Sequence, residues 1–293
     1  MQVYFQFRNI RVKNDIFSWN FRKNHYNNRY KQKEETVNSA NENIKVYMCP
    51  NYTNTRKAHK LKTKKVIDKN YKYLTNNVFK KFTSFIYYRV LATPFAFIYS
   101  KMIKHIKFEN KKVLKECKDR GYFVYANRTA DLGNFLAPHL ALLPKRTYTV
   151  AHTDNVCNAM LGNLGNSLGV LPVPNLLNGN RNFMNAIEKR VLQGNAVLIY
   201  PEEDYKKGDT IKPYSSTAFR YPVKFVEASY CFTTTYQQGK SKKKPKIVVY
   251  VDGPFYINKS LDEKSQQEDL RDRIYKTMCE RLKNNNYQGI KGE

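Results

Sequence analysis

The feature that most constrains this chain is the stretch from Gly121 to Phe135, which is typical of a strand, a polar turn and a helix in succession. Tyr122 to Tyr125 is a run of aromatic and β-branched residues, the composition of a buried strand. The polar residues from Ala126 to Asn134 predict a turn, and we expect a helix from Phe135 onward. Ligands of α/β proteins bind outside the carboxyl ends of the strands, so the sequence predicts a functional site in this turn.

Beyond residue 108 the chain alternates between predicted strands and helices. The further strand candidates are Thr147 to Ala151, Ala196 to Tyr200, Ser229 to Tyr236 and Ile247 to Val251. The clearest helix runs from Asn180 to Gln193, where apolar residues recur every fourth position and Gly194 follows as a cap. This alternation predicts an α/β fold with a mixed sheet flanked by helices. We assign residues 109–258 to this core and residues 259–293 to a C-terminal helix and tail, which Ser260 and Glu263 would open as a capping box.

A second polar cluster follows the predicted strand Ala196 to Tyr200. Pro201 comes first, and residues 202–204 are three consecutive carboxylates in a strongly basic protein. Neighbouring like charges raise one another's pKa or recruit a cation, which makes this loop a second site candidate. The alternative is an acidic loop solvated beside Lys206 and Lys207.

The charge of the chain limits its partners. Lys and Arg number 52 against 24 Asp and Glu, a formal net charge of +28. Such a charge attracts polyanions, which are an anionic membrane surface, a phosphorylated substrate or nucleic acid. Residues 1–68 are rich in Asn, Lys and Arg, which predicts a basic, disordered arm. Aromatic residues among the lysines of residues 1–81 keep an RNA-binding arm open, although no RNA-binding motif is present.

The cysteines and the first residues predict the compartment. The five cysteines lie far apart and show neither zinc-ligand nor disulfide spacing, so we expect no metal site and a reducing cytosol. Residues 1–14 alternate aromatic and polar side chains and contain no continuous apolar stretch, so we expect no signal peptide.

Residues 69–108 are an apolar and aromatic segment bracketed by lysines. Arg89 lies near its middle and Pro94 follows, whereas a spanning helix needs about 20 mostly apolar residues. We therefore expect an amphipathic helical segment that lies in the membrane interface, with lysines and tyrosines at the depth of the headgroups. The alternative is a helix packed on the protein's own core.

From about residue 65 onward the chain resembles the bacterial 1-acyl-sn-glycerol-3-phosphate acyltransferase family. The similar blocks, in order, are Gly121 to Phe135, Pro144 to Val150, Leu168 to Pro174, Arg181 to Arg190, Gln193 to Glu202, Ala218 to Val223, Thr233 to Gln237 and Tyr250 to Tyr256. The resemblance implies an acyltransferase core held on the membrane by N-terminal helices. It also implies transfer of a fatty acyl group from acyl-CoA or acyl-carrier protein to a hydroxyl of lysophosphatidic acid or a related lipid in phospholipid synthesis, with no cofactor.

The resemblance also implies which residues form the site. The family's mechanism uses an Asn-His pair followed by an Asp, in which the histidine takes the hydroxyl proton. Asn127 stands in the Asn position, but Arg128 replaces the histidine and Asn134 replaces the Asp. An arginine side chain stays protonated near neutral pH and cannot accept this proton.

Two interpretations of these replacements are open. In the first, another base such as Asp131, His152 or His139 serves the hydroxyl while Arg128 binds phosphate or the developing oxyanion. Of the two histidines, His152 is better placed, because His139 lies mid-helix beside Pro138. In the second interpretation the chain is a degenerate member that binds lipid phosphate without turnover.

The expected substrate-binding residues are Asn127, Thr129, Arg181, Pro201 and Glu202. The expected location is the cytoplasmic face of the cell membrane, as a peripheral protein on anionic lipid, with nucleic acid the less favoured partner.

Overall fold

The computed structural model of this chain describes residues 67–128, 132–151, 165–202, 211, 213–239 and 244–287. Contacts divide the chain into two units, Met1–His59 and Lys60–Glu293, and every described residue belongs to the second. The predicted basic arm, residues 1–68, therefore lies outside the described residues except at its last two positions.

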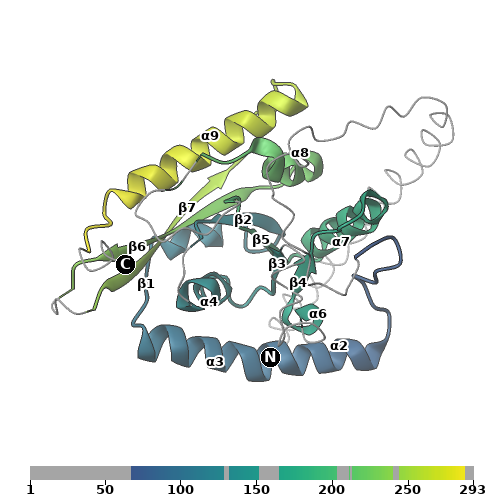
Figure 1. Ribbon diagram of the computed structural model, residues 1–293, viewed down its shortest axis with the longest axis horizontal. Helices are drawn as coiled ribbons and strands as arrows, with labels where there is room; N and C mark the ends of the chain where they lie inside the picture. The colour runs from purple at the N-terminus through teal and green to yellow at the C-terminus, as the bar shows by residue number, and fades with distance from the viewer. Residues whose placement is uncertain are drawn as a thin grey trace, which may run out of the picture. The chain divides into compact units, whose positions relative to one another are not determined.

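Seven strands form one mixed sheet in the order β1-β7-β6-β2-β5-β3-β4 (Figure 1). Their bounds are Lys107–Glu109 for β1, Tyr122–Ala126 for β2, Thr147–Ala151 for β3, Val170–Pro172 for β4, Ala196–Ile199 for β5, Ser229–Gln237 for β6 and Lys246–Phe255 for β7. The strands β6, β2, β5, β3 and β4 are parallel, whereas β7 is antiparallel to β6 and β1 is parallel to β7. The carboxyl ends of five strands thus meet at one edge, and the predicted α/β fold with a mixed sheet is confirmed.

Helices cover both faces of the sheet because the central strands are apolar on both. In β2, Phe123 and Tyr125 pack with the helices α7 and α9, while Tyr122 and Val124 pack on the other face with α4. The helical bounds are Leu132–Ala141 for α4, Gly165–Leu168 for α6, Asn180–Leu192 for α7, Arg220–Phe225 for α8 and Glu263–Leu282 for α9, with short 3₁₀ turns at Lys111–Lys115, Leu177–Gly179 and Ser216–Phe219. The predicted helix from Asn180 and the five predicted strands are confirmed within a few residues.

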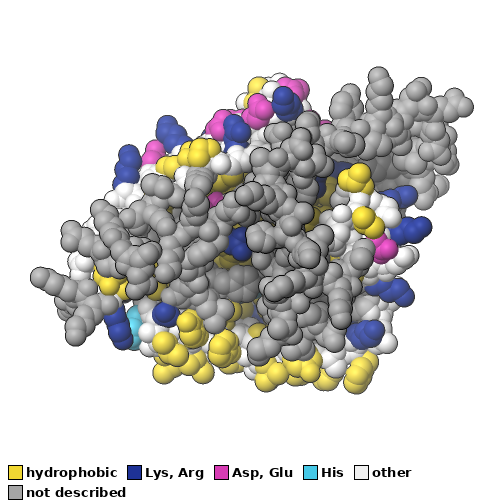
Figure 2. All heavy atoms as spheres, viewed as in Figure 1, with side chains coloured by type: hydrophobic (Ala, Val, Ile, Leu, Met, Phe, Trp, Pro, Cys, Tyr) yellow, Lys and Arg dark blue, Asp and Glu magenta, His cyan; other side chains and the backbone are white. Residues whose placement is uncertain are grey.

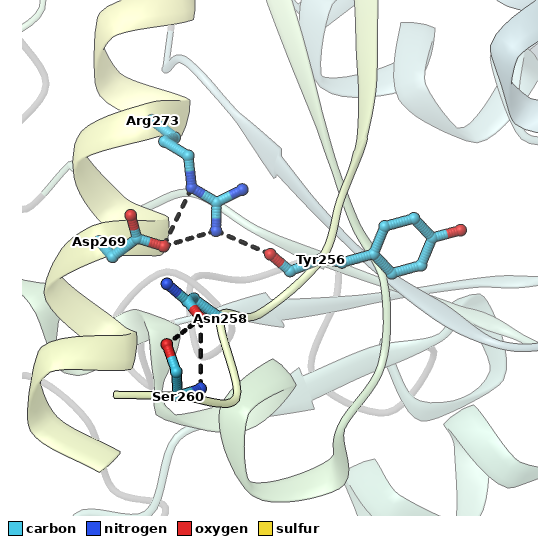
Figure 3. Close-up of polar contacts among 5 residues, drawn as sticks. All are labelled: Tyr256, Asn258, Ser260, Asp269 and Arg273. Carbon is cyan, nitrogen blue, oxygen red and sulfur yellow. Dashed lines mark hydrogen bonds and ion pairs between the residues drawn. The ribbon is translucent and has the colours of Figure 1, made fainter. Parts of the chain in front are cut away.

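The start of α9 differs from the predicted capping box. The helix begins at Glu263, and the carboxylate of Asp262 accepts hydrogen bonds from the backbone N–H groups of Lys264 and Ser265. Ser260 instead donates from its hydroxyl and its backbone N–H to Asn258 in the preceding loop (Figure 3). Further along the helix, Arg273 joins Asp269 at 2.7 Å and the carbonyl of Tyr256 at 2.7 Å, which fixes the helix against the end of β7 (Figure 3).

Within the apolar segment of residues 69–108, Val78–Ile103 form a continuous run of helical turns along the edge of the unit (Figure 1). It consists of α2 at Val78–Phe85, π-helical turns at Ile86–Ala92, α3 at Thr93–Phe97 and further π-helical turns at Ile98–Ile103. Every fourth residue, namely Ser84, Tyr88, Ala92, Ala96 and Ser100, is buried or half-buried. Among the described residues, no helix has both the length and the apolar character needed to cross a bilayer.

The large apolar side chains of this segment point away from the protein. We call them the interfacial face: Val78, Phe79, Phe82, Phe85, Tyr87, Val90, Leu91, Phe95, Phe97, Ile98, Met102 and Ile103, all of which are exposed. Figure 2 shows hydrophobic side chains gathered along the edge that α2 and α3 form in Figure 1. The arrangement inverts the usual one, because small or polar residues pack inward while phenylalanines face outward. The alternative of a helix packed on the protein's own core describes only the opposite side, where Tyr88, Ala96 and Ser100 are buried.

Candidate ligand site at the carboxyl edge of the sheet

Two neighbouring parallel strands deliver the candidate residues to one edge. β2 ends at Ala126 and continues into Asn127 and Arg128, while β5 ends at Ile199 and continues through Tyr200 and Pro201 into Glu202. Because Tyr125 pairs with Ile199 in the register of the sheet, the residues that follow both strands emerge side by side. We call Asn127, Arg128 and Glu202 the carboxyl-edge site.

Asn127 is buried, and its side chain is hydrogen-bonded to β6, the strand beside β2 in the sheet. Its carboxamide Oδ1 accepts from the backbone N–H of Thr234 at 2.8 Å, and its Nδ2 donates to the Thr234 carbonyl at 3.0 Å. The amide thereby extends the pairing of β2 with β6 by one residue after the strand has ended. These bonds leave Asn127 with a structural role at the base of the site, and its carboxamide faces β6.

Arg128 and Glu202 form the polar centre of the site. The backbone N–H of Arg128 donates to Glu202 Oε1 at 2.7 Å. Burial raises the pKa of the Glu202 carboxyl, and the hydrogen bond from Arg128 together with the charge of its side chain opposes that rise. Burial also raises the pKa of the neighbouring Tyr200 phenol. A cation and a partly desolvated carboxylate therefore lie together where two strands end.

The remaining predicted site residues are placed only in part. Thr129, Asp131 and His152 lie outside the described residues. Asn134 belongs to α4 by its backbone, and its side chain is likewise not described. Arg181 is exposed in the first turn of α7, which starts from the carboxyl edge.

Pro201 is buried between Tyr200 and Glu202, where it fixes the path of the chain out of β5. The structure thus brings Arg128, Pro201 and Glu202 together. It gives Arg181 no hydrogen bond or ion pair to them among the described residues.

His139 belongs to α4, and its side chain contacts two other elements. Its Nε2 lies 3.1 Å from the Thr149 hydroxyl of β3, and its Nδ1 lies 3.4 Å from the hydroxyl of Tyr88. Tyr88 belongs to the helical run Val78–Ile103, which we call the interfacial segment. Burial lowers its pKa to about 4. The imidazole is therefore neutral at pH 7 and ties α4 to β3, as expected of a packed histidine.

The described site offers one guanidinium and one carboxylate. Arg128 provides a guanidinium that can donate to a phosphate or an oxyanion. Glu202 is the carboxylate that lies beside it, and one of its oxygens is already engaged by the Arg128 backbone. No group of three or more His, Cys, Asp or Glu side chains in the described ranges could hold a metal ion.

Sequence reasoning named Arg128 and Glu202 separately but did not predict their contact. The two residues are 74 positions apart, and no local pattern reports a bond between a backbone N–H and a distant carboxylate. Sequence reasoning also missed the bond network of Tyr88, His139 and Thr149. The one available signal was that two buried strands each end in a polar turn, which predicts a shared edge and not a particular pair.

Comparisons with known proteins give a fold likeness only. A scan against protein families finds no match, and no curated protein matches the sequence. Among solved structures, the 1-acyl-sn-glycerophosphate acyltransferase PlsC from Thermotoga maritima is similar with a TM-score of 0.48 and 14% identity, over 70% of this chain and 88% of that one. The pilus retraction motor PilT with bound ADP is similar with a TM-score of 0.31 and 9% identity, over 60% of this chain and 58% of that one. At these values neither likeness assigns an activity.

Proposed function

We propose that this chain works at the surface of an anionic membrane, where it transfers a fatty acyl group from acyl-CoA or acyl-carrier protein to a hydroxyl of lysophosphatidic acid or a related lipid. The observation that carries the membrane part is the interfacial face. The acyl transfer part is supported by the resemblance of several sequence blocks to the acyltransferase family. In this proposal the chain is a peripheral protein of the cytoplasmic membrane face.

The physical argument for membrane binding rests on area and charge. Full burial of a phenylalanine or leucine side chain is favourable by about 1.5–3 kcal/mol, and the interfacial face offers many such side chains on one edge. Residues 69–108 also contain seven lysines and one arginine and no Asp or Glu. Each cation close to an anionic surface adds about 1 kcal/mol. An apolar face surrounded only by cations matches an anionic bilayer and would be costly in water.

In the reaction, the described residues would bind and orient the substrate, and the proton transfer would fall to other residues. Arg128 would hold the lipid phosphate or the oxyanion of the tetrahedral intermediate, since its guanidinium donates hydrogen bonds and carries a fixed charge. Glu202 holds the backbone of Arg128 and so orients it. The proton of the acceptor hydroxyl would go to Asp131 or His152, whose side chains are outside the described residues.

A second function, lipid-phosphate binding without turnover, is favoured by one specific observation. Where the family has a histidine, this chain has Arg128, and the buried His139 is packed against Thr149 and Tyr88. Loss of a general base commonly lowers the rate by a factor of about 10² to 10⁴. A chain without that base would still bind phosphate through Arg128.

The membrane part is tested by flotation with vesicles of phosphatidylcholine, with and without phosphatidylglycerol. A triple variant, Phe82→Ser, Phe85→Ser and Phe95→Ser, is compared with a control that changes three exposed leucines elsewhere, Leu177, Leu192 and Leu261, to Ser. We expect the phenylalanine variant to lose binding by at least about tenfold and the leucine control to bind as the unchanged protein does. Equal binding by both variants would refute the membrane proposal.

The reaction is tested with the purified protein, an acyl donor, lysophosphatidic acid and the same vesicles, beside an Arg128→His and Asn134→Asp double variant. Turnover by the unchanged protein supports the transferase, and Asp131 and His152 are then the next substitutions. Turnover by the double variant only would support the phosphate binder. Silence from both in folded protein, together with salt-sensitive binding of a labelled RNA that is lost on removal of residues 1–68, would instead support the RNA-binding arm.

A further inference from the structure

A pair of arginines lies at the opposite, amino edge of the sheet. Arg146 immediately precedes β3, and its carbonyl accepts from the backbone N–H of Ala196 at the start of β5. Arg190 lies in the last turn of α7. The two guanidinium carbons lie 5.3 Å and 4.5 Å from the centre of the same ring, that of Tyr148. Two side chains that are far apart in the sequence therefore converge on one aromatic side chain.

Neither arginine has a carboxylate partner among the described residues. Arg146 donates from Nη2 to the hydroxyl of Ser84 at 2.7 Å and to the carbonyl of Ser167 at 2.6 Å. Arg190 donates from Nη1 to the amide oxygen of Gln193 at 3.2 Å. The Nε atoms of both arginines are buried and make no hydrogen bond within the described ranges.

The electrostatics of the pair are unfavourable as they stand. Burial lowers the pKa of Arg190, the nearby Tyr148 phenol opposes that shift, and the neighbouring charge of Arg146 adds to it. Two like charges around one ring, without an anion, repel each other and lose part of their hydration. Arg146 is held in place nonetheless by its hydrogen bonds to Ser84 and Ser167 and by the ring of Tyr148. An anion that accepts hydrogen bonds from both guanidiniums would offset this repulsion.

The chemistry of the pair indicates which anion it suits. A guanidinium presents parallel N–H donors that match the oxygens of a phosphate, and two such groups supply both charge and geometry. Arg146 also lies over the ring of Tyr88, at 4.8 Å, and bonds to Ser84, both of which belong to the packed side of the interfacial segment. The pair is therefore next to the helices that carry the interfacial face.

We propose that Arg146 and Arg190 form a phosphate-binding site at the amino edge of the sheet, separate from the carboxyl-edge site. Its ligand is a phosphate group, which comes either from a lipid headgroup beneath the interfacial segment or from a soluble phosphate ester. Binding involves no covalent step. The proposal does not depend on acyl transfer, since it concerns different residues at the other end of the parallel strands.

The test compares Arg190→Gln with the control Lys189→Gln, which removes the same charge from the adjacent, exposed position of α7. The melting temperature is measured in sodium chloride, sulfate, phosphate and glycerol 3-phosphate at equal ionic strength. We expect phosphate or glycerol 3-phosphate to stabilise the unchanged protein and the Lys189→Gln control. We expect Arg190→Gln to bind these anions at least about tenfold more weakly. Equal anion-dependent shifts in both variants would refute a soluble phosphate ligand.

Vesicle flotation separates the two sources of phosphate. If the ligand is a lipid headgroup, Arg190→Gln binds vesicles containing phosphatidic acid at least about tenfold more weakly than Lys189→Gln does, whatever the soluble anions do. If neither soluble phosphate nor phosphatidic acid distinguishes the two variants, the site does not exist. Should Arg190→Gln not fold, Arg190→Lys replaces it, because lysine keeps the charge but lacks the paired donors. Phosphate binding by Arg190→Lys equal to that of the unchanged protein would then refute the proposal.

Discussion

Two stretches of this chain are built from aromatic and aliphatic side chains, and they end in opposite environments. All five residues of β2, Tyr122–Ala126, are buried between helices on the two faces of the sheet. The interfacial segment, Val78–Ile103, leaves its phenylalanines exposed and packs a stripe of small or polar residues inward. A strand in the middle of a sheet has both faces covered, whereas a helix at the edge has one side to pack and can present the other.

The comparison shows that aromatic content does not by itself predict burial. What separates the two stretches is the spacing of small or polar residues and the formal charge of each stretch. Ser84, Tyr88, Ala92, Ala96 and Ser100 recur every fourth position and allow the helical turns to lie close to the core. The same segment carries only positive formal charges, while β2 carries none.

The sharpest way to break the comparison is the same substitution in both stretches. Phe123 is 0% exposed and Phe82 is 60% exposed. We expect Phe123→Ala to lower the free energy of unfolding by about 3–5 kcal/mol, because it leaves a cavity in the core. We expect Phe82→Ala to change it by less than about 0.5 kcal/mol. Urea denaturation followed by circular dichroism measures both. A large loss in Phe82→Ala would mean that the interfacial face is packed in solution.

His139 joins the interfacial segment to β3 of the sheet, and its titration reports on that junction. Its folded pKa of about 4 is below the ordinary value of 6.5, so the unfolded chain binds its proton first as the pH falls. The contribution of His139 to the free energy of unfolding is therefore present above pH 6.5 and is lost as the pH falls toward 4. We expect a loss on the order of 2 kcal/mol between pH 7 and pH 5, which His139→Gln lacks. Denaturation of both proteins at the two pH values measures it, and identical losses would show that His139 is solvated.

The smallest expected effect distinguishes neighbouring tyrosines of the interfacial segment. The hydroxyl of Tyr88 accepts from the backbone N–H of Thr147 at 3.1 Å, and Tyr88 is 4% exposed. We expect Tyr88→Phe to lower the free energy of unfolding by about 1–2 kcal/mol, because that buried N–H loses its acceptor. Tyr87 is 39% exposed, so Tyr87→Phe should leave stability unchanged. Thermal unfolding compares the two, and equal melting temperatures would contradict the docking of the segment through Tyr88.

The sequence by itself determined the order of the main strands and helices. The strands β2, β3, β5, β6 and β7 are rich in aromatic and β-branched residues, and α7 has apolar residues every fourth position, so local patterns were sufficient. The sequence also placed a polar turn after β2 and another after β5. It did not predict β1 and β4, because runs of three residues are too short to show a period.

Only the tertiary structure decided which distant residues meet and which apolar side chains stay exposed. The contact of Arg128 with Glu202 depends on β2 and β5 being neighbours, and the convergence of Arg146 and Arg190 on Tyr148 depends on where α7 ends relative to β3. Likewise, the amphipathic pattern of residues 69–108 fitted either an interfacial or a packed helix. Only the assembled chain shows which stripe of that helix packs on the core and which side chains stay exposed, because no local window contains this information.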